Sequence, residues 1–262
     1  MITVHVAGIG LCAPGMSDWT TGRAVLRNEA PLGSEAPNPA PAILPSAERR
    51  RCGQATRFAL QVAQEAVTAS GIAATDAAVV FASADADGEN LHHILESLAT
   101  PEHEVSPTRF HNSVHNAAAG YWNIATGART PANSLAAFDS SLAAGLVEAA
   151  TQVVVESRPV LLVAFDLPFP SPLHEVRTLI APFATALMLT PQQSATSLAQ
   201  LAISLESAGG EESRLLVAEL EKLRTGNPAA RALPLLSAIA RREQQRLLFN
   251  WGGNDVHVEV KG

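Results

Sequence analysis

Short apolar runs that alternate with helical stretches of small residues are the feature that most constrains this chain. Residues 77–83 and 159–165 are compact, β-branched-rich runs of the kind found in buried strands. Between them, small and apolar residues recur at helical spacing over 110–127 and again over 140–155, with a further strand predicted at 132–137. This alternation predicts an α/β fold with three layers and a mostly parallel central sheet.

The same periodicities extend the pattern toward both ends. They predict a strand at 2–11, a helix at 54–70 that ends at Gly71, and a helix at 90–99. The proline-rich segment 28–46 favours an irregular loop. Toward the C-terminus we expect a strand at 185–189, a helical or extended run to about residue 205, helices at 211–223 and 234–242, and a strand at 256–260 after a turn at 251–254.

Charge and composition argue against several classes of function. The 262 residues are 47% hydrophobic, which predicts a large core in one or two domains. Eighteen basic and 25 acidic residues give a net charge of −7, which argues against a nucleic-acid partner. There is no apolar run long enough to span a membrane and no signal-peptide pattern, and only Cys12 and Cys52 are present. We therefore expect a cytoplasmic globular protein without a membrane span.

One stretch in the middle of the chain carries the most specific motif. In order along the sequence it contains Ser106-Pro107, Asn116, Ala119-Gly120, Gly127, Pro131 and Phe138-Asp139-Ser140-Ser141. This resembles the β-ketoacyl synthases of the thiolase-like fold, in which the same landmarks lead into Ala-Cys-Ser-Ser. The opening residues 6–10 and the closing residues 250–258 match the first strand and the C-terminal Gly-Gly-Asn loop of that family.

The resemblance breaks at the residues that perform the family's chemistry. In the ungapped register Asp139 occupies the position of the nucleophilic cysteine, and with a slip of one residue Phe138 does. Neither side chain can form the thiolate that a helix N-terminus activates in a ketosynthase. The family's two histidine motifs, His-Gly-Thr-Gly-Thr and Gly-His, are also missing. The sequence therefore predicts no catalytic residue, and it implies no cofactor and no metal.

The resemblance also divides the chain unequally. It covers residues 1 to about 205 and then only the final strand pair. We expect a complete ketosynthase N-terminal-like domain at 1–209 and a strongly shortened C-terminal remnant at 210–262, packed on the same body.

Short chains that lack the cysteine resemble the chain-length-factor-like proteins of aryl polyene and related bacterial pathways. The resemblance implies a non-catalytic partner of a full-length β-ketoacyl synthase in fatty acid or polyketide-like biosynthesis. The two subunits would form a heterodimer through strand 132–137, and an acyl carrier protein would reach this chain through the complex. The same resemblance places the interface and acyl tunnel at Phe110, His111, Ser113, Val114, His115, Ala118, Tyr121, Asn133, Leu135 and Phe138. Val114 and Ala118 are expected to share one helical face at the pocket floor.

Other interpretations of these residues stay open. Asp139 before two serines is typical of a helix N-cap. Ser140 or Ser141 with His111 or His115 would suit an acyltransferase or hydrolase, although the Gly-x-Ser-x-Gly motif is missing. The two histidines are spaced as zinc ligands but have no third partner, so helix packing is their simpler role. A pure stabilising scaffold is a further alternative.

Overall fold

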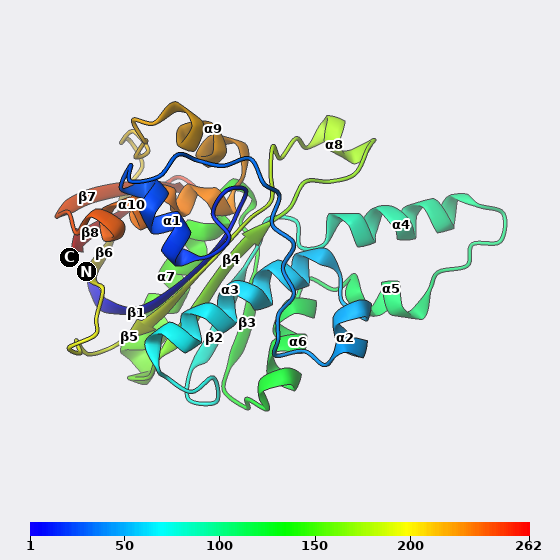
Figure 1. The fold of residues 1–262 in the computed structure, drawn as a ribbon, viewed down its shortest axis with the longest axis horizontal. Coiled ribbons are helices and arrows are strands. Elements are labelled where there is room, and N and C mark those ends of the chain that lie inside the picture. The colour runs from blue at the N-terminus through cyan, green and yellow to red at the C-terminus, as the bar shows by residue number, and fades with distance from the viewer.

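The computed structural model describes residues 1–262, and its centre is one eight-stranded sheet covered by helices on both faces (Figure 1). The strand order is β3-β2-β4-β5-β1-β6-β8-β7. The strands are β1 (Ile2–Cys12), β2 (Ala78–Ala82), β3 (Ala132–Leu135), β4 (Val160–Asp166), β5 (Phe183–Thr190), β6 (Ala199–Ser207), β7 (Gln245–Trp251) and β8 (Asn254–Lys261). The three-layer α/β architecture is as predicted.

The helices pack into two hydrophobic cores, one on each face of the sheet. Apolar residues of α3 and α6 form one core, and those of α1, α7, α9 and α10 contribute to the other. The helices are α1 (Trp19–Leu26), α2 (Ser46–Arg51), α3 (Gln54–Ser70), α4 (Gly88–Ala99), α5 (Pro107–Asn112), α6 (Ala117–Thr126), α7 (Ser141–Glu156), α8 (Leu173–Val176), α9 (Ala218–Gly226) and α10 (Leu233–Arg241), with 3-10 turns η1 (Phe138–Ser140) and η2 (Ala229–Ala232). Two covered faces explain why β2 and β4 are buried along their whole length and β5 up to its last residue.

The expectation of a mostly parallel sheet is wrong. Only β2 pairs in parallel, with β3 on one side and β4 on the other. All remaining pairs are antiparallel. Apolar runs do not distinguish the two cases here, because an antiparallel sheet covered on both faces hides its strands as fully as a parallel one.

Two glycines of β1 allow α3 to lie directly on the sheet. A Cβ on Gly8 would lie 2.3 Å from the carbonyl oxygen of Ala66, and one on Gly10 would lie 2.0 Å from that of Val62. No side chain fits at either position. The Gly8-Ile9-Gly10 motif therefore serves close packing of a helix on a strand.

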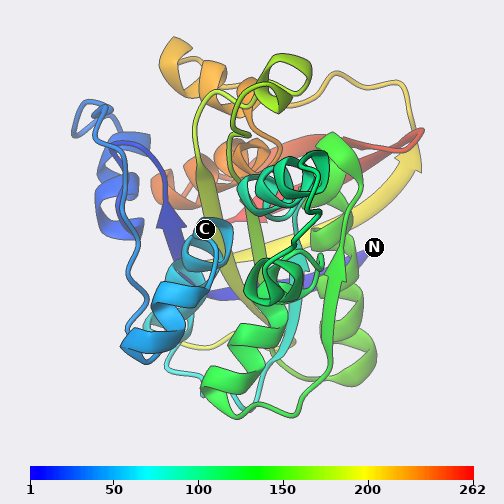
Figure 2. The ribbon, with the colours of Figure 1, turned by 90° about the vertical axis from the view of Figure 1, so that its right-hand side faces the viewer.

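The helices α4 and α5 form an arm that projects from the body, toward the right in Figure 1 and toward the viewer in Figure 2. The predicted single helix at 110–127 is wrong, because α5 ends at Asn112 and α6 begins at Ala117. The hydroxyl of Ser113 donates a hydrogen bond to the carbonyl oxygen of Phe110, a local contact that competes with helix continuation.

Two further expectations change near the C-terminus. The run before residue 205 is extended and forms β6, which pairs with β1 and β8. The helix predicted at 211–223 begins only at Ala218. The preceding residues lie along the sheet edge instead, where the Ser213 amide donates to the Leu248 carbonyl and the Leu248 amide donates to the Ser213 hydroxyl. This segment covers the edge strand β7.

The helices α1 and α2 were not predicted from the sequence. An Asp18–Thr21 capping box starts α1, and α1 and α2 are both short enough for their periodicity to be weak.

None of the helices in the structure has both the length and the apolar character that crossing a bilayer requires.

Candidate functional site

Polar and charged residues gather where the three parallel strands end. The strands β2, β3 and β4 run in the same direction, so their carboxyl ends meet at one edge of the sheet. Ser83 and Asp85 follow β2, Asp139 follows β3, and Asp166 ends β4. Open α/β sheets carry their ligand and active sites at this kind of edge.

The turn from Leu135 to Ser141, here called the elbow, joins β3 to α7 through η1. Phe138 has a φ of 51°, a left-handed conformation that is costly for an aromatic residue. The Ser141 hydroxyl holds the turn, since it accepts from the Ala137 amide at 2.9 Å and donates to the Phe138 carbonyl at 2.7 Å. A strained strand-to-helix turn is the geometry that exposes nucleophiles in other enzymes, and here it exposes a phenyl ring at 62% of its surface.

The carboxylate of Asp139 binds two arginines and does not cap α7. Its Oδ1 lies 2.8 Å from Nη1 of Arg177, and its Oδ2 lies 3.5 Å from Nη2 of Arg231. The N-cap of α7 is Ser140, whose side chain makes no capping hydrogen bond. The N-cap interpretation of Asp139 is therefore wrong.

Arg177 also covers Phe138. Its guanidinium carbon lies 3.8 Å from the centre of the Phe138 ring, in cation–π contact. Its Nε donates to Oδ2 of Asp85 at 3.1 Å. Two carboxylates and one ring thus fix a single arginine over the elbow.

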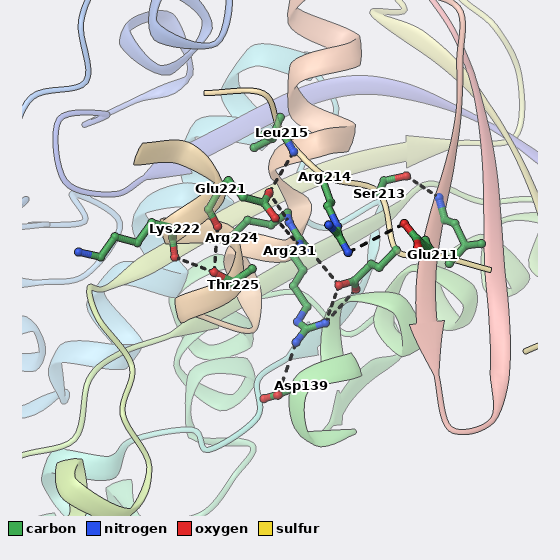
Figure 3. Close-up of polar contacts among 12 residues, drawn as sticks. Asp139, Glu211, Ser213, Arg214, Leu215, Glu221, Lys222, Arg224, Thr225 and Arg231 are labelled. Carbon is green, nitrogen blue, oxygen red and sulfur yellow. Dashed lines mark hydrogen bonds and ion pairs between the residues drawn. The ribbon is translucent and has the colours of Figure 1, made fainter. Parts of the chain in front are cut away.

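From Asp139 an ion-pair network continues into the C-terminal part of the chain (Figure 3). Arg231 binds both oxygens of Glu212, at 2.8 and 2.9 Å. Glu212 also accepts from Arg224 at 2.7 Å, and Arg224 makes a bidentate pair with Glu221 at 2.8 Å for each bond. Hydrogen bonds from Arg224 lower the pKa of Glu221. The network therefore ties segment 211–232 to the elbow, and its members are Asp85, Arg177, Asp139, Arg231, Glu212, Arg224 and Glu221.

Asp166, the last residue of β4, is fully buried. Burial raises its pKa to about 7, against the opposing effect of hydrogen bonds from the Ser83 hydroxyl and the Ala84 amide. Those bonds, at 2.9 and 2.7 Å, both go to Oδ1, and Oδ2 has no partner. Sequence reasoning missed Asp166, although an acidic residue that ends an apolar strand was a signal for it.

The two candidate histidines do not share a helix: His111 lies in α5, and His115 lies in the break between α5 and α6. His115 lies with Nε2 3.0 Å from the carbonyl oxygen of Ser83, and His111 stacks edge-on against Tyr121 with ring centres 6.0 Å apart. Neither makes a hydrogen bond to Ser140 or Ser141, and no three His, Cys, Asp or Glu side chains converge as metal ligands. The Ser141 hydroxyl is committed to the elbow backbone.

An apolar cavity of about 660 Å³ lies between α5, α6 and the end of the proline-rich loop. Of the residues predicted for the tunnel, Phe110, His111, Val114 and Tyr121 line it, but Ser113, His115 and Ala118 do not. Ala118 is 3% exposed and lies in the core with α3. Val114 lies between the helices, so the shared helical face of Val114 and Ala118 is wrong.

The cavity also contains residues that the sequence did not single out. Gly120 and Ile124 of α6 line it, together with Ile43 and Leu44 of the loop. The signal for the loop residues was an isolated apolar pair among prolines. Gly120 has open space where a Cβ would stand.

The strand β3 forms one edge of the sheet and carries the other predicted interface residues. It pairs only with β2. The Asn133 amide turns back to α7, where it donates to Glu148 at 2.8 Å, and Leu135 is half-buried. The outer backbone groups of β3 are unpaired, which leaves a template for another strand.

Comparison with known proteins defines the class of this protein. A family model described as "Beta-ketoacyl synthase, N-terminal domain" matches residues 22–250, so the chain belongs to that family. Its eight-stranded sheet, covered by helices on both faces, has the thiolase-like fold, with the N-terminal half complete and the C-terminal half shortened. A comparison with curated proteins finds no match.

Several solved structures share this fold. A structure of a ketosynthase in complex with its chain length factor from Xenorhabdus doucetiae has a TM-score of 0.75 at 24% identity, and the match covers 99% of this chain and 100% of that one. A type II polyketide ketosynthase complex with its acyl carrier protein has a TM-score of 0.78 at 14% identity and 99% coverage of both chains. The ishigamide ketosynthase/chain length factor has a TM-score of 0.74 at 14% identity and 99% coverage of both.

Proposed function

We propose that this protein is a non-catalytic, chain-length-factor-like partner of a full-length β-ketoacyl synthase. The observation that carries the proposal is the arginine-bound Asp139 at the elbow. The chemistry of this family requires a thiolate at the start of the helix that follows. Here that place holds a phenyl ring, a carboxylate and two arginines.

Backbone strain favours Phe138, rather than Asp139, as the residue at the nucleophile position. Strained conformations persist where the surrounding structure enforces them, and they concentrate at functional sites. Phe138 has the only positive φ within the elbow. In this proposal the elbow geometry of the family remains, while Arg177 fills the space in front of it.

The proposed heterodimer uses the free edge of β3. Some of the most similar structures contain a ketosynthase with a chain length factor, and one contains an acyl carrier protein. A strand of the ketosynthase would pair with β3, and the apolar cavity beside it would form part of the acyl tunnel for a polyene or polyketide-like chain. Phe110 and Ile124, exposed at 68% and 82%, supply apolar surface for the partner to cover.

The division of the chain into 1–209 and 210–262 stays part of this proposal, as does a cytoplasmic location for the complex. The ion-pair network supports a role for the shortened second part, because it ties that part to the elbow through Arg231 and Glu212.

The test is co-expression with a ketosynthase encoded beside this protein, followed by sizing and a condensation assay. We expect a stable complex of one copy of each chain, and a change in product length or yield when this chain is omitted. A ketosynthase that forms a homodimer and makes the same products with or without this chain would contradict the proposal. Complex formation without an effect on product length would indicate that this chain acts only as a stabilising scaffold for the ketosynthase.

A further inference from the structure

A polar cavity of about 510 Å³ lies between α2–α3 and the arm. Its volume is that of a small-molecule site, but only one of its 15 lining residues is hydrophobic. Four arginines line it: Arg50, Arg51, Arg57 and Arg109. No member of the ion-pair network contributes, so this cavity is separate from the elbow. We call it the arginine cavity.

Three of these arginines have no acidic partner. Arg51 pairs with Glu48 at 3.3 Å, but Arg50, Arg57 and Arg109 form no ion pair. The Nε of Arg57 is buried and donates no hydrogen bond. A buried donor without an acceptor is costly, and more so when it is charged. Arg57 also lies beside the Cys52 thiol, where it opposes the rise in the thiol's pKa that burial causes, but its Nε has no acceptor in the cavity.

The start of α3 adds further free donors to the same wall. Gly53 is the N-cap of this 17-residue helix, and no side chain accepts from the first amides that follow it. Gly53 and Gln54 both line the cavity. The unpaired amides and the helix dipole favour negative charge at this end, where Oδ2 of Asp87 already lies against Gly53 without a hydrogen bond.

Asp87 restricts what kind of anion fits. Its Oδ1 accepts from the Asn90 amide at 2.9 Å and caps α4, whereas its Oδ2 is buried without a donor. Asp87 and Glu89 also bring negative charge to the cavity wall. A ligand that completes the site must accept hydrogen bonds from the arginines and also donate one to Asp87. An ionised carboxylate or a sulfate has no hydrogen to donate at neutral pH. Inorganic phosphate keeps at least one P–OH, and a phosphate monoester, whose second pKa is about 6, has one after it takes up a proton from water on binding.

We propose that the arginine cavity binds a phosphate group, either inorganic or as a monoester. Its charged oxygens accept from Arg57, Arg109 and the first amides of α3, and its P–OH donates to Oδ2 of Asp87. The elbow and the apolar cavity play no part in this site, so it stands whether or not the proposed function holds.

The experiment titrates the full-length chain with inorganic phosphate and with glycerol phosphate, using calorimetry, with sulfate and acetate as comparison ions. We expect saturable phosphate binding and weaker binding of both comparison ions. Binding of both phosphates identifies a monoester site, and binding of inorganic phosphate alone identifies a free-phosphate site. Equal responses to all four anions, or no saturable binding, would overturn the proposal.

Three variants test the assigned contacts. Arg57→Gln and Arg109→Gln should each weaken phosphate binding by about tenfold, as expected for a lost charged hydrogen bond. Arg109→Gln is the safer of the two for folding, because Arg57 has a buried Nε within α3, whereas Arg109 has no buried unpaired atom. Asp87→Asn keeps an oxygen to cap α4 and replaces the acceptor Oδ2 with an amide donor, which can bind a charged phosphate oxygen, so it should bind phosphate at least as tightly as the unchanged protein. Arg23→Gln, at an exposed arginine outside the cavity, is the control. An Arg109→Gln variant that binds phosphate as tightly as the Arg23→Gln control would overturn the assignment.

Discussion

Nη1 of Arg177 lies 2.8 Å from Oδ1 of Asp139, and the same guanidinium covers the ring of Phe138. Burial acts to lower the pKa of Arg177, but hydrogen bonds to Asp139 and Asp85 outweigh it and the pKa is raised. The arginine therefore stays charged and fixed over the elbow. The guanidinium thus occupies one side of the Phe138 ring, while the rest of that residue stays exposed.

Replacing Arg177 with Met should lower the free energy of unfolding by about 1–2 kcal/mol, because Asp85 and Asp139 lose their common partner. Asp139 is 40% exposed, so water screens part of the loss. Urea unfolding measures the change. The matched control is Arg246→Met, because Arg246 and its partner Glu206 are exposed at 58% and 50%. Losing this pair should lower the free energy of unfolding by less than about 0.5 kcal/mol. Equal losses of unfolding free energy in Arg177→Met and Arg246→Met would show that the ion-pair network stabilises the chain no more than an exposed surface pair does.

Phe138→Cys places a thiol on the strained turn, and we expect no condensing activity from it. The side chains that contact Phe138 and Asp139 are arginines, and neither arginine can act as a general base at neutral pH. The unchanged protein should also gain no mass after incubation with an acyl thioester. Intact-mass measurement and a condensation assay test both points. A stoichiometric adduct on the unchanged protein would contradict the non-catalytic proposal.

Ser134→Pro should prevent assembly with the ketosynthase while the chain stays folded. The amides of Val79 and Ser83 donate to the carbonyls of Pro131 and Leu135, so residues 131 and 135 face β2. Backbone groups alternate along a strand, so those of Ser134 face the free edge. Leu135→Pro is the contrasting variant and should destabilise the chain itself. Co-purification and circular dichroism separate the two effects. Undiminished assembly of Ser134→Pro would place the interface elsewhere.

Gly120 offers a way to fill the apolar cavity without disturbing the core. Gly120→Ala should stabilise the chain by about 0.5–1 kcal/mol, because a helical glycine is replaced where space is open. Gly120→Phe should shorten the products of the reconstituted complex at unchanged complex yield, as should Val114→Phe. Ala118→Trp, in the core, should cost about 1–3 kcal/mol by overpacking instead. Unchanged product lengths for both Phe variants would argue against the tunnel role.

Asp166 should make the protein less stable as pH rises. Its folded-state pKa, about 7, lies above the ordinary value of 3.8, so the folded state binds more protons between these values. The contribution of Asp166 is then fully present below pH 3.8, falls as pH rises toward about 7, and is lost above it. Asp166→Asn keeps an acceptor for Ser83 and Ala84 and removes the titration. Urea unfolding at several pH values should show a weaker decline for this variant. If the free energy of unfolding depends on pH in the same way in Asp166→Asn and in the unchanged protein, the raised pKa of Asp166 is contradicted.

The sequence by itself determined the elements and the family. Helix α3, strands β2 and β4 and helix α7 were predicted within one or two residues of their observed bounds, because each depends on the periodicity of adjacent residues. The absence of a cysteine from residues 138–141 could also be read directly from the sequence. The motif from Ser106 to Ser141 then fixed the order of elements around the elbow.

Only the tertiary structure decided what those residues contact. Asp139 has the local sequence of an N-cap. Its carboxylate instead binds Arg177 and Arg231, which are distant in the sequence, and does not bind the first amides of α7. The choice between Ala118 and Gly120 as the cavity residue depended on which side of α6 packs against α3, where Ala118 lies in the core and Gly120 faces the cavity. Long-range ion pairs and helix packing leave no local pattern in a sequence, so neither could be read from spacing alone.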